Sequence, residues 1–230
     1  KLGLKHIHTL HDVQLATPSG LIIRGQEKDW AKINYFSRRY LKLNKKFFSQ
    51  TDIVISPSRW LMDFYDRLGF FTKSTKLVLP NPIKLTAEMM ANFRISKAEI
   101  TKSQTVGDAK KALVQSKVIK NNFNFLYLGQ IEDHKGVLFL IKVFQKFCQL
   151  PNRRDVMLYI VGKGTKLMRA KVIANKNPYI IFRGQLPHEQ LAKIFSQIDF
   201  TIVPSFCYEN SPSVIYESFS YGVPVIASDV

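Results

Sequence analysis

The sequence predicts an α/β protein in which parallel strands alternate with helices. Short apolar runs recur at regular distances from about residue 123 onward, and helix-like stretches separate them. The runs are almost continuously apolar, which indicates strands buried on both faces of a parallel sheet. In sheets of this kind, ligands bind beyond the carboxyl ends of the strands. Polar residues at those ends are therefore the candidates for a binding site.

The second half of the chain contains the clearest pattern. Strands are expected at 124–129, 156–162, 179–184, 199–205 and 223–228. Helices are expected near 136–149, 165–175, 188–197 and 212–220. The last helix has the best-defined ends, because Ser211 and Pro212 form a strong helix start and Gly222 and Pro224 stop it.

The first half repeats this order less clearly. Strands are expected at 5–12, 52–58 and 76–82, and helices at 28–49 and 59–68. The pattern Asp-x-x-Ile-x-Pro-Ser occurs in both Asp52–Ser58 and Asp199–Ser205, which favours two similar halves.

Three regions follow from these patterns. We expect a partial first domain at 1–84, a Lys-rich linker or insertion at 85–122, and a second domain at 123–230. The chain begins within one predicted strand and stops directly after another. The sequence therefore predicts a fragment, truncated at both ends, whose second domain lacks its C-terminal closure.

The chain is strongly basic. It has 34 Lys and Arg against 17 Asp and Glu in 230 residues, a formal net charge of +17. Such an excess favours an anionic partner: nucleic acid, an acidic membrane surface or a phosphate-bearing substrate. Residues 38–48 carry five of the basic side chains among aromatic residues and leucines. This segment is expected either to lie against anionic lipid or to be a packed helix with a charged outer face.

The cysteine content and the hydropathy bear on the cellular location of the protein. Cys148 and Cys207 have neither metal-ligand spacing nor the pattern of a disulfide framework, so a reducing, cytoplasmic location is expected. No apolar run reaches the length of a membrane span, and the first residues lack the apolar core of a signal peptide.

Two acidic residues flank the predicted start of the last helix. The free N–H groups near Ser213 and Val214 form an anion site by geometry. Glu209 precedes the cap and Glu217 lies inside the helix, and a carboxylate suits two neighbouring hydroxyls, as on a ribose or a hexose. The segment could thus hold a phosphate between two sugar-binding carboxylates. Alternatively, Glu217 faces solvent and Glu209 is only part of a loop.

Two further side chains stand at predicted strand ends. Lys135 is expected at the start of the helix after the first strand of the second half, where an ammonium can neutralise a phosphate leaving group. His11 follows the first strand of the chain, where an imidazole can orient or polarise a substrate hydroxyl. Each is more often a surface or structural residue when it occurs alone.

A glycine turn follows the second strand of this half. The segment "YIVGKGTKL" (159–167) matches neither the dinucleotide fingerprint nor the phosphate-binding P-loop, because the required residues are missing at the fixed spacings. What remains is a tight turn at Gly162 and Gly164, which would let backbone approach a ligand.

Together these residues resemble glycosyltransferase family 4, retaining enzymes of the GT-B fold. Glu209 and Glu217 form the family's Glu-x7-Glu motif, followed here by "GVPVIAS". The segments "LYLGQIEDHKG", "LYIVGKG", "IIFRGQLPHEQL" and "IVPS" come in the family's order, so this part of the match covers 123–230. In the first part, "TLHD", "DIVISPSRWL" and "LVLPNPI" resemble the end of the family's acceptor-binding domain. The resemblance implies a GT-B-like fold with two Rossmann-like domains.

The resemblance also implies residue roles. Glu217 would hold the ribose of a nucleotide-diphosphate sugar, Lys135 would stabilise the departing diphosphate, and Gly184 would lie near the nucleobase. The two implied catalytic residues are Glu209, at the donor sugar, and His11, near the incoming hydroxyl. The whole implied donor-binding set is Gly129, Gln130, Lys135, Gly162, Gly164, Gly184, Asn210, Ser211, Ser213, Val214 and Glu217.

One position departs from the family's pattern. The family usually has Arg where this chain has Gln130, and glutamine offers only neutral hydrogen bonds where arginine offers a permanent charge and a forked grip on phosphate. Either a nearby cation such as Lys163 compensates, or the donor is held more weakly.

The resemblance thus implies a cytoplasmic, metal-independent, retaining glycosyltransferase without a cofactor. The chain has no Asp-x-Asp motif for a metal. The acceptor would be a glycan or a lipid-linked molecule in cell envelope polysaccharide biosynthesis, with peripheral contact to the inner face of the membrane; nucleic acid is not expected as a partner. The alternatives are a non-catalytic polyanion-binding protein, or a GT-B sugar phosphorylase or nucleotide-sugar epimerase.

Overall fold

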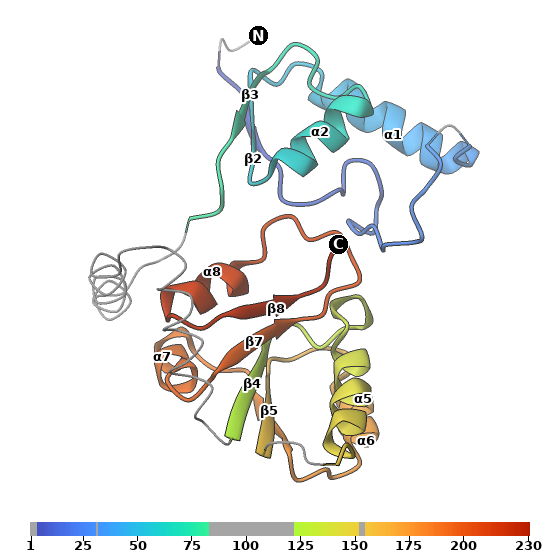
Figure 1. The fold of residues 1–230 in the computed structure, drawn as a ribbon. Helices are drawn as coiled ribbons and strands as arrows, with labels where there is room; N and C mark the ends of the chain where they lie inside the picture. Colours follow the sequence, from blue (N-terminus) through green and yellow to red (C-terminus); the bar gives the residue numbers. More distant parts are fainter. Residues whose placement is uncertain (1–3, 31, 83–121, 152–154) are drawn as a thin grey trace. The chain divides into compact units, whose positions relative to one another are not determined.

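The computed structural model describes residues 4–30, 32–82, 122–151 and 155–230. The chain forms two compact units (Figure 1). Unit 1 takes in the described residues up to Pro82 together with Cys207–Pro212 and Val230, and unit 2 takes in the rest. The expected linker at 85–122 lies outside the described residues, except for Asn122.

Unit 2 is built on a five-stranded parallel sheet, as the sequence predicts. Its strands run in the order β6-β5-β4-β7-β8. They are β4 (Asn122–Leu128), β5 (Asp155–Val161), β6 (Ile180–Gly184), β7 (Phe200–Val203) and β8 (Val225–Ala227). Each end lies within two residues of the expected bound, because the apolar runs are the segments that this sheet buries.

Helices cover both faces of this sheet (Figure 1). They are η1 (Asp133–Lys135), α5 (Val137–Cys148), α6 (Leu167–Ala174), η2 (His188–Gln190), α7 (Leu191–Phe195) and α8 (Ser213–Ser220). Neighbouring residues of β4 point to opposite faces, so Tyr127 joins the core under α5 and α6 while Leu126 joins the core under α7. Both residues are buried, which explains why successive positions at this end of the strand are apolar.

The strand order identifies where a ligand site is expected. The chain starts at the central strand β4, proceeds outward to β5 and β6, and then returns to the other side of β4 to form β7 and β8. The connections therefore change direction between β4 and β7, and a crevice forms at the carboxyl ends of such neighbouring strands. The β4–α5 loop and the loop after β7 flank this point.

Helix α8 is fixed to the sheet by a buried hydroxyl. Ser218 is fully buried and is hydrogen-bonded to the Thr201 hydroxyl on β7 (2.7 Å) and to the Val223 carbonyl oxygen (2.8 Å). The helix ends at Ser220, and Gly222 follows with a φ of 70°, which is typical of a helix stop and expected from the sequence. The rotation of α8 about its axis, and with it the position of Glu217, is set by this contact.

We expect Ser218→Ala to lower the free energy of unfolding by about 1–3 kcal/mol, because buried polar partners lose their hydrogen bonds. Urea unfolding of the variant measures this loss. In the double variant Ser218→Ala/Thr201→Val the loss should be smaller than the sum of the two single losses. Additive losses would show that the two hydroxyls do not depend on each other.

Unit 1 is a three-stranded parallel sheet with two helices. The strands β1 (Ile7–Thr9), β2 (Ile53–Ser56) and β3 (Thr75–Val78) lie in that order, and the helices are α1 (Tyr35–Phe48) and α2 (Arg59–Arg67). The prediction of a helix from residue 28 is wrong: α1 begins seven residues later, because the Asn34 side chain caps it by accepting from the Ser37 amide (2.9 Å).

A buried tyrosine holds the segment after β1. The Tyr65 hydroxyl donates to the Asp12 carbonyl oxygen (2.9 Å) and accepts from the Leu15 amide (3.1 Å). Burial raises the pKa of Tyr65, so the hydroxyl stays protonated as a donor. These bonds fix the backbone next to His11. Among the described residues, no helix has the length and apolar character that crossing a membrane requires.

Candidate functional site

The loop after β4 is held against the loop after β5. The Ile131 amide donates to the Lys163 carbonyl oxygen (2.9 Å), and the Thr165 amide and hydroxyl both donate to the Glu132 carboxylate (2.6 and 2.7 Å). The hydrogen bond from the Thr165 amide lowers the pKa of Glu132, which therefore carries its charge at neutral pH. The loop after β4 and the loop after β5 therefore hold each other in place at the carboxyl ends of these strands.

The glycines of these loops have a packing role. A Cβ on Gly162 would lie 1.8 Å from the Gly129 carbonyl oxygen, and one on Gly164 would lie 2.3 Å from the Ile131 carbonyl oxygen. Glycine at both positions therefore lets the two loops approach each other. Gly184 is different, since it has a φ of 70° but nothing within 4 Å of an added Cβ.

Lys135 is placed where the connections change direction. It ends η1, and the His134 carbonyl oxygen beside it accepts from the Phe206 amide (2.8 Å) in the loop after β7. On its other side, Gly136 has a φ of 71° and a Cβ there would lie 1.8 Å from the Pro204 carbonyl oxygen. The backbone of Lys135 is therefore fixed between the carboxyl ends of β4 and β7, where the strand order places a ligand.

The residue that replaces the family's arginine lies on the same loop. Gln130 is exposed, and its carbonyl oxygen accepts from the Tyr127 hydroxyl (2.5 Å). Lys163 is also exposed, and its carbonyl oxygen bonds the amide of the residue after Gln130. The contact between the two loops therefore places Lys163, which is positively charged, next to Gln130.

Helix α8 presents two candidate residues on one side. Ser213 and Glu217 are one helical turn apart, so they lie on the same face. Ser213 is exposed, whereas Val214 and Glu217 are half-buried.

In unit 1, the segment Cys207–Pro212 contains three candidate residues and is hydrogen-bonded to a fourth, His11. The Asn210 side-chain nitrogen, Nδ2, donates to the His11 carbonyl oxygen (3.0 Å), and its side-chain oxygen, Oδ1, accepts from the Ser58 hydroxyl (2.5 Å). The Ser211 carbonyl oxygen accepts from the Asn81 side chain (3.5 Å). Glu209 is half-buried and His11 is exposed.

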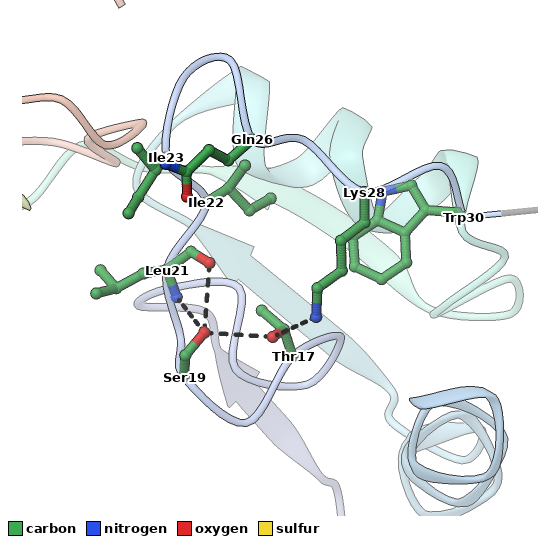
Figure 2. Close-up of a pocket in the computed structure, with 8 residues that line it drawn as sticks. All are labelled: Thr17, Ser19, Leu21, Ile22, Ile23, Gln26, Lys28 and Trp30. Carbon is green, nitrogen blue, oxygen red and sulfur yellow. Dashed lines mark hydrogen bonds between the residues drawn. The ribbon is translucent and has the colours of Figure 1, made fainter. Parts of the chain in front are cut away.

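The same segment lines a pocket that the sequence did not reveal. This open pocket of about 530 Å³ is lined by nine residues of unit 1: Ile22, Glu27, Lys28, Trp30, Trp60, Phe64, Arg67, Leu68 and Tyr208. A smaller neighbouring pocket of about 250 Å³ shares Ile22, Lys28 and Trp30 with it (Figure 2). The only signal in the sequence is that Tyr208 directly precedes Glu209. Nothing in the spacing connects it to Trp30 and Trp60.

The candidate residues therefore form one group in each unit. Unit 1 holds His11, Glu209, Asn210 and Ser211; unit 2 holds Gly129, Gln130, Lys135, Gly162, Gly164, Gly184, Ser213, Val214 and Glu217. Their joint action on one donor stays a prediction. In the part of the chain that the structure describes, no three His, Cys, Asp or Glu side chains are grouped so that they could hold a metal ion.

The second half of the chain resembles a known family of enzymes. Residues 122–230 match the family model of "Glycosyl transferases group 1". The structure is similar to sucrose-phosphate synthase from Thermosynechococcus elongatus, with a TM-score of 0.64 at 21% identity over 100% of this chain and 51% of that one. It is also similar to HepE of Anabaena, solved in complex with UDP-glucose, with a TM-score of 0.61 at 17% identity over 98% of this chain and 54% of that one. The expected α/β fold of the GT-B glycosyltransferases is confirmed.

Among curated proteins, the chain is similar to an uncharacterized glycosyltransferase of Methanocaldococcus jannaschii. The two are 22% identical over 215 residues, which cover 91% of this chain and 47% of that protein. The chain spans between 43% and 48% of the length of three curated relatives, about half of each.

Proposed function

We propose that the protein containing this chain is a retaining, metal-independent glycosyltransferase of family 4. It transfers a sugar from a nucleotide-diphosphate sugar to a hydroxyl of a glycan or lipid-linked acceptor. One observation carries the proposal: residues 122–230, which match the glycosyl transferases group 1 model, place Lys135 where the strand order predicts a ligand.

The chemistry of the reaction supports these residues. Cleavage of the bond between sugar and diphosphate leaves negative charge on the diphosphate, and a fixed ammonium at that place lowers the barrier. Lys135 supplies this charge, and the first amides of α8, near Ser213 and Val214, add a favourable dipole. Because these groups meet the charge of the leaving group, the proposed mechanism requires no metal.

We propose for the remaining residues the roles that the resemblance to family 4 implies. Glu217 accepts from the ribose hydroxyls, and Glu209 contacts the donor sugar with Asn210 and Ser211. Lys163 compensates for the missing arginine at Gln130, while Gly129, Gly162, Gly164 and Gly184 shape the loops beneath the nucleotide. His11 contacts the donor sugar and the incoming hydroxyl, with its backbone held by Asn210 (3.0 Å).

The experiment is a transfer assay with product analysis. The protein is incubated with UDP- and GDP-sugars and a mixture of glycan acceptors, with and without EDTA, and the anomeric configuration of the product is read by NMR. We expect a product with the donor's configuration and an unchanged rate in EDTA. An inverted product or a rate abolished by EDTA would refute the corresponding part of the proposal.

We further propose that the protein works at the cytoplasmic face of a membrane, with α1 lying against anionic lipid. Phe36, Leu43 and Phe47 follow one side of this helix and are 81%, 46% and 74% exposed. Helix α1 has five basic residues and no acidic one, and it buries only Leu41. Aromatic residues beside lysine and arginine are typical of helices at the surface of anionic bilayers.

The double variant Phe36→Ser/Phe47→Ser should bind vesicles containing anionic lipid at least about tenfold more weakly, because the apolar area that enters the interface is lost. Co-sedimentation with phosphatidylglycerol vesicles measures the binding, and Phe139→Ser, which removes a 53% exposed phenylalanine from α5, is the control. Equal binding by all three proteins, or equal binding to uncharged vesicles, would refute the role of α1.

A further inference from the structure

The larger pocket of unit 1 has walls of aromatic rings. Trp60 stacks on Tyr208 with ring centroids 5.2 Å apart and an angle of 3° between the planes, and on Phe64 at 5.6 Å and 18°. Trp30 meets Phe64 edge to face at 5.6 Å. The rings stack on one another, so the gaps between them do not admit a nucleobase. Their edges and remaining faces line the cavity and can contact the C–H groups of a sugar ring.

Hydrogen bonds hold Tyr208, one of the aromatic residues of this pocket, in place. The Tyr208 amide donates to the Ile22 carbonyl oxygen (3.0 Å), and its hydroxyl donates to Glu27 Oε1 (2.8 Å). The Gly25 amide donates to the same oxygen (2.9 Å) and lowers the pKa of Glu27. The backbone and the ring of Tyr208 are therefore both held in place.

The charged side chains of the pocket favour an anion. Lys28 and Arg67 line it together with Glu27, the only acidic residue among the nine. Neither cation forms an ion pair with a described residue. Lys28 Nζ is 3.1 Å from the Thr17 hydroxyl, which lies 3.3 Å from the Ser19 hydroxyl (Figure 2). Arg67 is exposed at the edge of α2, where its guanidinium could bind a carboxylate or a phosphate through two hydrogen bonds.

The position of the pocket connects it to the predicted chemistry. Tyr208 directly precedes Glu209, and Asn210, one residue further on, is hydrogen-bonded to the backbone of His11. The short segment Tyr208–Asn210 therefore connects the pocket to the two residues to which we assign catalytic roles. A volume of about 530 Å³ is in the range that encloses a small-molecule ligand.

We propose that this pocket binds an acidic saccharide, with its sugar rings against Trp30, Trp60 and Tyr208 and its carboxylate or phosphate on Arg67 and Lys28. The identification of this saccharide as the acceptor rests on the proposed glycosyltransferase function; the binding itself does not. Uronic acids and sugar phosphates share the required chemistry.

Intrinsic fluorescence tests this proposal directly, because Trp30 and Trp60 are the only two tryptophans of the chain. The chain is titrated with cellobiouronic acid, with cellobiose, which differs in the group at one carbon, and with glucose 6-phosphate. We expect at least one of the two anions to change the emission and to bind about tenfold more tightly than cellobiose. A response to cellobiouronic acid would show that the pocket accepts a carboxylate, and a response to glucose 6-phosphate would show that it accepts a phosphate.

Arg67→Ala should weaken binding of the anion about tenfold and leave the affinity for cellobiose unchanged. Arg59→Ala, which removes an exposed arginine from the same helix outside the pocket, is the matched control and should bind as the wild type does. Equal affinities for cellobiose and both anions, no response to either anion, an unchanged Arg67→Ala variant, or displacement of the anion by UDP would overturn the proposal. Circular dichroism of each variant shows that it is folded.

This outcome is distinguishable from that of the transfer assay. Donor turnover without a fluorescence response would leave the glycosyltransferase proposal intact and overturn the pocket. A response to the anion without any donor turnover would support an acidic-saccharide site and overturn its assignment as the acceptor site.

Discussion

Lys135→Ala is expected to lower kcat for sugar transfer about 10²- to 10³-fold, the effect typical of removing one fixed charge or donor from a developing anion. The charge on the diphosphate grows in the transition state, so KM for the donor should change much less than kcat. The backbone around Lys135 is fixed by the His134–Phe206 hydrogen bond and by Gly136 against Pro204, and neither contact uses the lysine side chain. The variant should therefore keep both of these contacts.

Steady-state kinetics with a nucleotide-sugar donor measures this effect. Lys135→Arg should recover part of the rate, because it keeps the charge, and Lys142→Ala, which removes an exposed lysine from α5, should be unaffected. A kcat for Lys135→Ala within threefold of the wild type would exclude the lysine from the chemical step.

Gly162→Ala is expected to cost about 3 kcal/mol or more of folding stability. Its φ is 144°, and the new Cβ would lie 1.8 Å from the Gly129 carbonyl oxygen, so backbone strain and a steric clash add together. Relief of the clash requires the loop after β4 to move, and that loop carries Gln130 and leads into Lys135. Donor affinity should therefore fall together with stability.

Gly184→Ala is the matched control for this prediction. Gly184 also has a positive φ, 70°, but nothing lies within 4 Å of the added Cβ, so only the conformational cost of about 1 kcal/mol is expected. Urea unfolding of the two variants separates the clash from the strain. If both lost the same stability, the close packing of the two loops would not be the reason for glycine at 162.

Much of unit 2 could be predicted from the sequence, because a parallel sheet covered on both faces has almost continuously apolar strands. The runs around Leu126 and Leu158 gave β4 and β5 within two residues. Gly162 and Gly164 lie in the loop directly after β5, at a strand end as predicted. In the structure these glycines approach the backbone of Gly129 and Ile131. This contact joins two loops more than 30 residues apart in the sequence, and no local pattern encodes such a pairing.

Unit 1 was harder to predict. The sequence from Lys28 to Ile33 has helical composition, but a side-chain cap at Asn34 starts α1 later and leaves Lys28 and Trp30 to line the pocket. In the pocket, Trp30 and Trp60 both contact Phe64, and Tyr208 joins them only through the return of Cys207–Pro212 to unit 1. Long-range contacts of this kind are absent from periodicity and motif spacing.

Donor binding is the most direct test of the account. The melting temperature of the protein is measured with saturating UDP- and GDP-sugars for the wild type, Glu217→Ala, Lys135→Ala and Lys142→Ala. The account predicts that at least one donor stabilises the wild type and Lys142→Ala equally, that most of this stabilisation is lost in Glu217→Ala, and that Lys135→Ala keeps most of it, because its lysine acts mainly in the transition state. No stabilisation of the wild type by any donor, or equal stabilisation of all four proteins, would contradict it.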